Sequence, residues 1–363
     1  MEQFYKKTKA KMHKVKRHWL TVAFFLGFVL DNITLNRVDQ VFDNIVLFFY
    51  VILVMVSLLI MYASAAEKLP GRLQVYGRKY AQLLVQFAMG GLLSGMLIFY
   101  GRSGSWLESW PFLLIILAVI YSNETIKNRS QRLVFNIAML FIGLFSYVVL
   151  VVPVFTGKMG AWVFVGSGFV ALLIMILFIK TLRRIVPHFI QLHLRAVAFT
   201  VGAIYISLNF FYFSNMIPPI PLSLKDVGIY HSVVHFDDGS YRLTYEKPEW
   251  YVFWRKSDTT FHFEPGDNIF CFASVFAPTR LATDIYHKWE RYNEELGQWD
   301  EYGRFSYAIE GGRGSGFRGY TLIKNYSIGT WRCTVETERG QVIGREEFTV
   351  SSEPRGELVT RTE

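Results

Sequence analysis

The sequence predicts a multi-pass α-helical membrane bundle of about seven helices, followed by an all-β domain with an immunoglobulin-like sandwich fold. Three observations lead to this prediction. The chain is 52% hydrophobic and has a mean hydropathy of +0.26, values that are typical of integral membrane proteins. Long apolar segments fill most of the chain up to residue 213, where aromatic residues and prolines cluster. Beyond this cluster, apolar and polar residues alternate as they do in β-strands.

Seven apolar segments are candidate membrane spans, since a span needs about 20 apolar residues. They are Trp19–Leu35, Val41–Tyr62, Ala81–Tyr100, Trp106–Tyr121, Leu133–Phe155, Ala161–Ile179 and Leu192–Phe213. The first reaches Asp31 and Asn32 before its end, and the fourth is short and contains Pro111, so these two are the weakest. In the third, Gly91 and Gly95 form a small-xxx-small pattern that lets helices approach closely.

The distribution of positive charge predicts the orientation of these spans. If the basic N-terminal segment, residues 1–18, lies inside, this segment and the inner loops hold 18 Lys and Arg residues, against three in the outer loops. Because Lys and Arg accumulate on the cytoplasmic side, we expect a cytoplasmic N-terminus and, after seven spans, a β domain outside the cytoplasm. The loss of one weak span would reverse the side of the β domain.

The two halves of the chain differ in net charge. The first 224 residues carry 21 Lys and Arg against 7 Asp and Glu, and the remainder carries 17 against 22. A nucleic-acid-binding protein would have its basic surface on the soluble domain, so nucleic acid is excluded as a partner. Ionisable residues are also scarce deep within the spans, which argues against ion-coupled transport.

A junction of residues 214–228 separates the membrane domain, residues 19–213, from the β domain. Pro218, Pro219 and Pro221 interrupt any helix there. Proline-rich segments are extended and stiffer than Gly/Ser chains. We therefore expect the junction to be a semi-rigid spacer.

The β domain is predicted to span residues 229–350, with a polar tail at 351–363. Nine of its segments have β character: Ile229–Phe236, Tyr241–Tyr245, Tyr251–Trp254, Ile269–Phe276, Asp284–Tyr292, Arg304–Ile309, Phe317–Ile323, Thr330–Thr337 and Val342–Val350. Turn signals rich in Gly, Asp and Pro separate several of them. Short strands at this spacing favour an antiparallel sandwich.

Several short motifs in this half recur in a recognisable order: Tyr286–Trp289, Gly311–Arg318, Lys324, Gly329–Arg332 and Gly340–Phe348. Together they resemble the bacterial domain-of-unknown-function family 2914, over roughly residues 280–350. The resemblance implies a bacterial protein in which such a domain follows a membrane region. It implies no activity, and no catalytic residue can be carried over from it.

Cys271 and Cys333 are the only cysteines of the chain, and both lie in the domain that we expect outside the cytoplasm. An oxidising compartment permits a disulfide between them. Immunoglobulin-like sandwiches join their two sheets by such a bridge, with a Trp packed against it, a role that Trp289 could fill.

The register of the Ile269–Phe276 segment decides whether this bridge forms. If Cys271 faces the core, the bridge can form, and Phe270, Phe272 and Phe276 become an outer apolar stripe that needs a partner. If the phenylalanines face the core, Cys271 points outward and no bridge exists. Both alternatives stay open at this point.

Basic residues around the glycine-rich segment Gly311–Gly316 form a second candidate binding surface. The glycines indicate a turn, since the segment precedes a strand and lacks the lysine of a phosphate-binding loop. Arg313, Arg318 and Lys324 could bind an acidic glycan or a phosphate. The alternative is a solvated strand edge that discourages pairing.

Neither a metal site nor an enzymatic site is predicted. His231 and His235 are four residues apart, which suits a metal on a helix, but their segment has β character. The sequence holds no Ser in a G-x-S-x-G elbow, and the acidic pairs fall in a hairpin loop where solvated charge is expected. We therefore expect no cofactor and no catalysis.

We expect a protein of the bacterial inner membrane that displays its β sandwich outside the cytoplasm. The sandwich would be a protein- or glycan-binding module in an envelope assembly, with the lipid bilayer and an envelope or membrane protein as partners. The alternative is a transporter or channel capped by the β domain, which would need a polar cavity near the midplane of the bilayer. A membrane enzyme would need acid and base groups at the outer span ends, where only Asp31, Asp39 and Asp43 gather.

Overall fold

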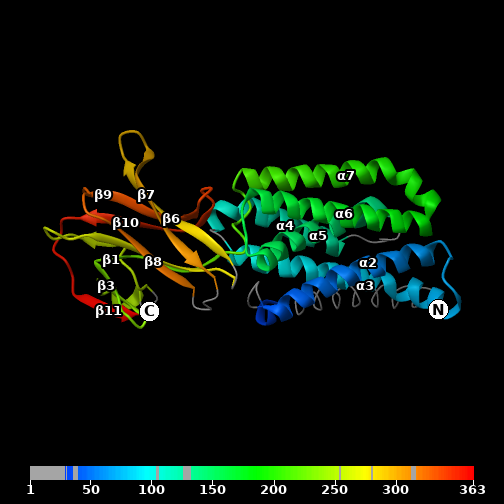
Figure 1. Cartoon of the computed structure of the whole chain (residues 1–363), viewed down its shortest axis with the longest axis horizontal. Coiled ribbons are helices and arrows are strands. Elements are labelled where there is room, and N and C mark those ends of the chain that lie inside the picture. The colour runs from blue at the N-terminus through cyan, green and yellow to red at the C-terminus, as the bar shows by residue number, and fades with distance from the viewer. Residues whose placement is uncertain are drawn as a thin grey trace, which may run out of the picture. The chain divides into compact units, whose positions relative to one another are not determined.

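The protein is described by a computed structural model that covers residues 29, 31–35, 40–103, 106–125, 132–252, 255–278, 281–311 and 316–363. The chain divides into two compact units, one made of helices and the other made mainly of residues 215–363 (Figure 1). The predicted division into a helical and a β-rich part is therefore confirmed.

Six long helices form most of the first unit: α2 (Val41–Ala65), α3 (Gly71–Arg102), α4 (Trp106–Thr125), α5 (Leu133–Thr156), α6 (Ala161–Ile185) and α7 (Pro187–Phe213). Five of them, all except α4, are long and apolar enough to cross a membrane, and α4 contains a shorter apolar stretch, Ser109–Asn123. The first predicted span, Trp19–Leu35, lies mostly outside the described residues. The predicted bundle is thus confirmed as a set of membrane-length helices.

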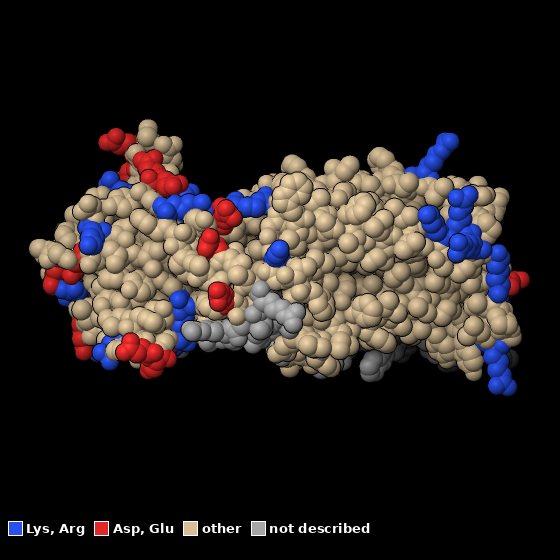
Figure 2. Space-filling model, in the orientation of Figure 1, with Lys and Arg blue, Asp and Glu red and all other residues tan. Residues whose placement is uncertain are grey.

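Charge is distributed along the helices as the sequence predicts for spans. On the face seen in Figure 2, the middle of the helical unit is free of charged residues, and basic residues gather at one end. Arg183 and Arg184 lie in the last turn of α6, where the chain turns into α7. An uncharged belt with basic residues beyond it is the pattern that a bilayer selects.

The two predicted packing glycines lie where α2 meets α3. A Cβ atom on Gly91 would lie 2.6 Å from the ring of Tyr50, and one on Gly95 would lie 2.7 Å from Leu47. Both distances are shorter than real Cβ contacts, so a side chain at either position would force Tyr50 or Leu47 to move. The small-residue pattern is thus a helix-packing face.

Among its described residues, the second unit has eleven strands: β1 (Ser223–Tyr230), β2 (Ser232–His235), β3 (Tyr241–Glu246), β4 (Thr260–His262), β5 (Ile269–Phe276), β6 (Ala282–Asn293), β7 (Gln298–Glu310), β8 (Phe317–Ile323), β9 (Gly329–Thr337), β10 (Val342–Ser351) and β11 (Leu358–Thr362). They make three sheets with the strand orders β1-β5-β8, β4-β10-β9-β6-β7 and β11-β3-β2. Neighbouring strands are antiparallel, except that β4 and β10 are parallel.

The three sheets form layers, and β5 lies in the middle one. One face of β5 carries Cys271, which belongs to a core shared with β6, β9 and β10. The other face carries Phe272, which packs with Tyr230, Val233 and Leu243 against the β11-β3-β2 sheet. Both faces of β5 are therefore buried, and the predicted choice between a cysteine core and a phenylalanine core is wrong. The third sheet, which the sandwich prediction lacks, covers the second face.

Several boundaries differ from the prediction. Trp250–Val252 forms a 3-10 turn in place of a strand, and residues 253–254 are outside the described residues. The polar tail is not free, because β11 pairs with β3 along its length. Ile217 and Leu222 of the predicted spacer are buried in the β unit, where Gln341 Nε2 donates to the Ile217 carbonyl at 3.3 Å. Most of the proline-rich segment therefore belongs to the β domain.

Loss of the Cys271–Cys333 bond should destabilise the β domain, because the bond closes a loop of 62 residues. In the chain-entropy relation such a loop contributes about 4 kcal/mol to the free energy of unfolding. Pulse proteolysis of full-length Cys271→Ser/Cys333→Ser in urea measures this loss. Thiol labelling of the denatured, unreduced wild type should find no free thiol, and two labelled thiols would contradict the bond.

Candidate functional site

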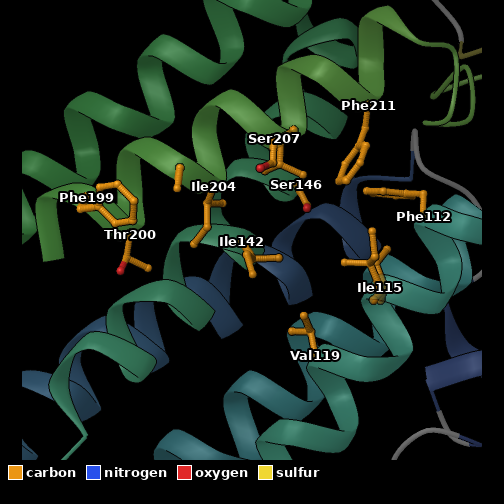
Figure 3. Close-up of a pocket in the computed structure, with 13 residues that line it drawn as sticks. Phe112, Ile115, Val119, Ile142, Ser146, Phe199, Thr200, Ile204, Ser207 and Phe211 are labelled. Atoms are coloured by element: carbon orange, nitrogen blue, oxygen red, sulfur yellow. The ribbon is translucent and has the colours of Figure 1, made fainter. Parts of the chain in front are cut away.

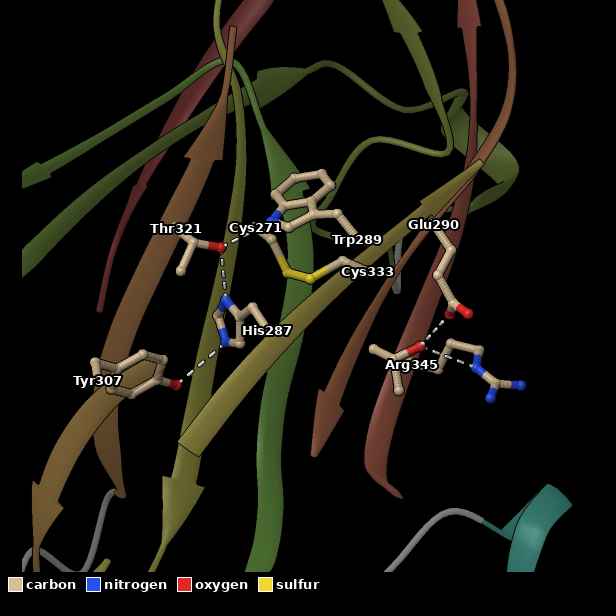
Figure 4. The surroundings of a disulfide bond; sticks show 9 residues. Cys271, His287, Trp289, Glu290, Tyr307, Thr321, Cys333 and Arg345 are labelled. Carbon is tan, nitrogen blue, oxygen red and sulfur yellow. Dashed lines mark hydrogen bonds between the residues drawn. A yellow bond between two sulfur atoms is a disulfide. The ribbon is translucent and has the colours of Figure 1, made fainter. Parts of the chain in front are cut away.

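The disulfide lies at the centre of the β domain. It joins Cys271 of β5 to Cys333 of β9, with 6.5 Å between the two Cα atoms, and so ties the middle sheet to the five-stranded sheet (Figure 4). Trp289 of β6 pairs in register with Cys333 and lies in the same fully buried cluster. The bridge and the neighbouring Trp thus have the arrangement that the immunoglobulin comparison predicts.

A buried chain of polar groups borders the bridge (Figure 4). The Thr321 hydroxyl lies 3.0 Å from His287 Nδ1 and accepts from Trp289 Nε1 at 2.9 Å. On the other side of the ring, His287 Nε2 lies 3.2 Å from the Tyr307 hydroxyl. Burial lowers the pKa of His287 to about 3, so the ring is neutral at physiological pH. His287 and Trp289 are fully buried and their ring nitrogens are partnered, which indicates a structural role.

The residues predicted to form an apolar binding stripe are largely inside the domain. Phe272 and Phe276 are buried, and Phe270 is half-buried against the ring of Tyr320. The predicted stripe is therefore wrong for Phe272, which packs against the third sheet, and for Phe276, which is buried as well. The β5 sequence, apolar except for Ser274, is itself the sign of a strand buried on both faces.

The basic residues predicted to form a binding surface do not lie close together either. Arg313 lies outside the described residues. Arg318 is in β8 and Lys324 directly follows that strand, six positions further on. At about 3.3 Å per residue the two lie about 20 Å apart, too far for one small anion to contact both. Lys324 is exposed at a turn, as the solvated-edge alternative expects.

The edge strand β7 is a surface that the sequence analysis missed. β7 ends the five-stranded sheet, and among the described residues only β6 pairs with it. Ile309 is the only buried residue of its 13, whereas Tyr302 and Phe305 are 43% and 42% exposed. The predicted strand, Arg304–Ile309, is less than half as long as β7. A long edge with unpaired backbone groups and exposed aromatic rings can accept another strand.

On the outer face of the same sheet, basic and acidic side chains form ion pairs with one another. Arg332 donates two hydrogen bonds, of 2.6 and 3.0 Å, to the Glu290 carboxylate, which is drawn in Figure 4. Lys288 Nζ lies 2.8 Å from the same carboxylate. Burial alone would raise the pKa of Glu290, but the Arg332 and Lys288 bonds hold it below its usual range. Arg304 pairs likewise with Glu336 at 2.7 Å. The cations of this face are therefore not free to bind an acidic ligand.

A second polar cluster lies where β1 passes into β2. His231 stands between these strands, and its Nε2 atom lies 3.2 Å from Glu246 Oε1 and 3.7 Å from Asp258 Oδ2. Glu246 also receives His262 Nδ1 at 2.8 Å. His235, which the sequence analysis considered together with His231, is exposed and its ring contacts that of Tyr241 instead, in a tilted arrangement. Sequence spacing could not show this cluster, because its members come from four separate segments.

The electrostatics of this cluster follow from burial. Burial lowers the pKa of His231 and raises that of Asp258 to about 8. Burial would also raise the pKa of Glu246, but hydrogen bonds from His262 and from the Gly356 N–H lower it below its usual range. Two carboxyl groups and an uncharged imidazole thus share one small buried volume.

The helical unit has an apolar groove of about 270 Å³ between α4, α5 and α7 (Figure 3). Its lining includes Phe112, Ile142 and Phe211, with hydroxyl groups from Ser146 and Ser207. None of its lining residues is ionisable. Such a groove suits a hydrocarbon chain and offers no group for proton or ion coupling.

Glu346 of β10 should make the stability of the β domain depend on pH. Burial raises its pKa to about 7, with Arg255 lowering and Asp226 raising it. Since the folded pKa exceeds the ordinary value of 4.5, the contribution of Glu346 to stability is complete below about pH 4.5 and is lost as pH rises through 7. In the wild type, the free energy of unfolding of the β domain should therefore fall by up to about 3 kcal/mol between pH 5 and 8, and Glu346→Gln should abolish this fall.

Urea unfolding at several pH values measures this decline, with Glu347→Gln as the control. Glu347 is the exposed neighbour on the same strand and raises the pKa of Glu346 less than burial or Asp226 does, so its substitution should change the pH profile much less. A profile that Glu346→Gln does not flatten would contradict the assignment.

Comparison with known proteins gives a match of one segment to a family, and it gives no activity. No curated protein matches the chain. Among solved structures, the Pseudomonas fluorescens alkylpurine DNA glycosylase AlkC bound to DNA containing an abasic site analog is 8% identical, with 87% of this chain and 100% of that chain covered. Its TM-score of 0.21 is too low to bear on fold or function. Residues 282–350, which run from β6 to β10, match the family described as "Protein of unknown function (DUF2914)".

Proposed function

We propose that this chain is an inner-membrane protein of bacteria whose β domain lies outside the cytoplasm and binds a partner protein at the β7 edge. The observation that carries the proposal is the edge of β7, which is 13 residues long, has nine exposed residues and pairs with β6 alone in the part of the chain that the structure describes. An extended segment of a partner can add a strand there, with affinity from main-chain hydrogen bonds and specificity from side-chain contacts.

The surroundings of the edge favour a protein over an acidic glycan. Arg304 lies over the ring of Tyr286 at 4.0 Å, and Arg332 lies over the ring of Trp299 at 4.1 Å. Because both guanidinium groups also hold buried carboxylates, neither is available to an anionic sugar. The exposed ring of Phe305 instead offers apolar contact beside the backbone groups.

Two features support a location outside the cytoplasm. The inner loops and the N-terminus hold 18 of the basic residues, against three in the outer loops. The Cys271–Cys333 disulfide suits an oxidising compartment such as the periplasm. We also propose that the two sheets joined by this bridge form an immunoglobulin-like core, to which the β11-β3-β2 sheet is added.

The apolar groove supports a second candidate function. A transporter or channel capped by the β domain could use the space between α4, α5 and α7 for an apolar substrate. The lining carries no ionisable group, so such transport would not be coupled to protons or ions through this groove. Growth or uptake assays with hydrophobic compounds separate this candidate from the binding module.

Site-specific photo-crosslinking tests the β7 edge. A benzoylphenylalanine at Phe305 should capture a protein adduct of defined mass in native membranes. The same group at Val234 should not, although the two side chains are 42% and 45% exposed. Phe305→Lys should reduce recovery of the adduct partner on the order of tenfold, because a charged edge discourages pairing. Equal capture at both positions, or capture at Val234 alone, would contradict the proposal.

Reporter fusions test the orientation. A periplasmic reporter fused after Phe213 should be active, and the same reporter fused after Lys79 should be silent, because Lys79 lies in the first part of α3, before the predicted third span, on the inner side in the proposed topology. Activity at Lys79 together with silence at Phe213 would reverse the orientation. Cytoplasmic reporters at the same two positions provide the matched control.

A further inference from the structure

Three donor atoms of the polar cluster stand at the spacing of metal ligands. His231 Nε2, Glu246 Oε1 and Asp258 Oδ2 all lie within 4.8 Å of one another. His231 Nε2 is 3.2 Å from Glu246 Oε1 and 3.7 Å from Asp258 Oδ2. Ligand atoms bound to one zinc ion at about 2.0–2.2 Å stand about 3.3 Å apart in tetrahedral geometry. A small inward shift of Asp258 would complete this spacing.

The second oxygen of each carboxylate is held by hydrogen bonds, and the His231 ring is held by stacking although its Nδ1 atom has no hydrogen-bond partner. Asp258 Oδ1 accepts from the Glu246 N–H at 2.7 Å. Glu246 Oε2 accepts from the Gly356 N–H at 3.1 Å and lies 2.8 Å from His262 Nδ1. The His231 ring stacks on Phe261, with 4.0 Å between the ring centroids. Outer hydrogen bonds of this kind orient the ligands of protein metal sites.

One donor is left without a hydrogen bond inside the domain. Asp258 is 3% exposed, and its Oδ2 atom has no hydrogen-bond partner while it faces His231 Nε2. Buried polar atoms are nearly always partnered, and an unpartnered carboxylate oxygen is costly. A cation between Asp258, Glu246 and His231 removes this cost, because it neutralises both carboxylates at once.

We propose that His231, Glu246 and Asp258 bind one divalent transition-metal ion, zinc in the first place, at the crossing from β1 to β2. The imidazole favours zinc over magnesium or calcium, and the two carboxylates supply the balancing charge. Three protein ligands leave the fourth position to water. This site is separate from the β7 edge and does not depend on the function proposed for it.

The ion would fasten the third sheet to the rest of the domain. Glu246 ends β3, Asp258 precedes β4, and His231 is the residue at which the chain leaves the middle sheet for β2. A ligand that binds the folded state alone stabilises that state by mass action. The unfolding temperature of the β domain therefore rises with zinc concentration.

Metal analysis of the full-length protein in detergent tests the site. After treatment with a chelator and addition of zinc, the wild type should retain about one zinc per chain, and its β domain should unfold about 5 °C higher or more. Asp258→Asn and His231→Gln should lose both the retained zinc and the shift. His235→Gln, an exposed histidine four residues from His231, should keep both.

Cobalt gives a readout that does not depend on stability. Cobalt in place of zinc should give the visible absorption of a four-coordinate ion in the wild type and in His235→Gln, and none in Asp258→Asn. Near-ultraviolet circular dichroism without metal confirms that the variants are folded. Failure of the wild type to retain zinc, or equal loss of zinc in His235→Gln, would overturn the proposal.

Discussion

Burial of β5 on both faces is the constraint on which the β domain depends. Cys271 on one face bonds to the five-stranded sheet, and Phe272 on the other packs against β2 and β3. Every residue from Cys271 to Ala277 is buried, so the strand can accept no polar substitution without loss of packing. The strands of the two outer sheets can carry more polar residues, because each outer sheet has a second face or an edge in water. Function is therefore expected at those edges and not at the centre.

The sequence predicted the parts of this fold that local pattern determines. The ends of α2, α5 and α7 lie within a few residues of the expected spans, and β5 and β8 have the expected ends. The third sheet was missed for a physical reason. Its strand β11 has only five residues, too short for a period of two to stand out, and it depends on pairing with the distant β3. β4, which belongs to the five-stranded sheet, has only three residues and was missed for the same reason. The length of β7 was underestimated for a similar reason, because its exposed residues do not alternate with apolar ones.

The candidate sites were harder to predict than the fold. A surface position of Phe272 was one of two alternatives, because a two-sheet sandwich leaves one face of every strand in water, and the third sheet removes that face. His231 was set aside as a metal ligand because its spacing to His235 suits a helix and the segment has β character. Glu246 brings His231 together with His262 across 15 and 16 residues of chain, a contact that only the strand pairing creates. Such sites have no local signature, so no spacing rule would have found them.

The family match covers only part of the unit that folds. Residues 282–350 hold β6 to β9 and nearly all of β10, including the proposed binding edge and Cys333. The partner cysteine, Cys271, lies before that segment in β5, as does β1, which pairs with β5. Without β1 and β5 the five-stranded sheet would expose Trp289, Trp331 and Val335 to water. The matched segment therefore supplies most of the five-stranded sheet together with β8, and the chain before it supplies β1 and β5, which complete the middle sheet that closes the core.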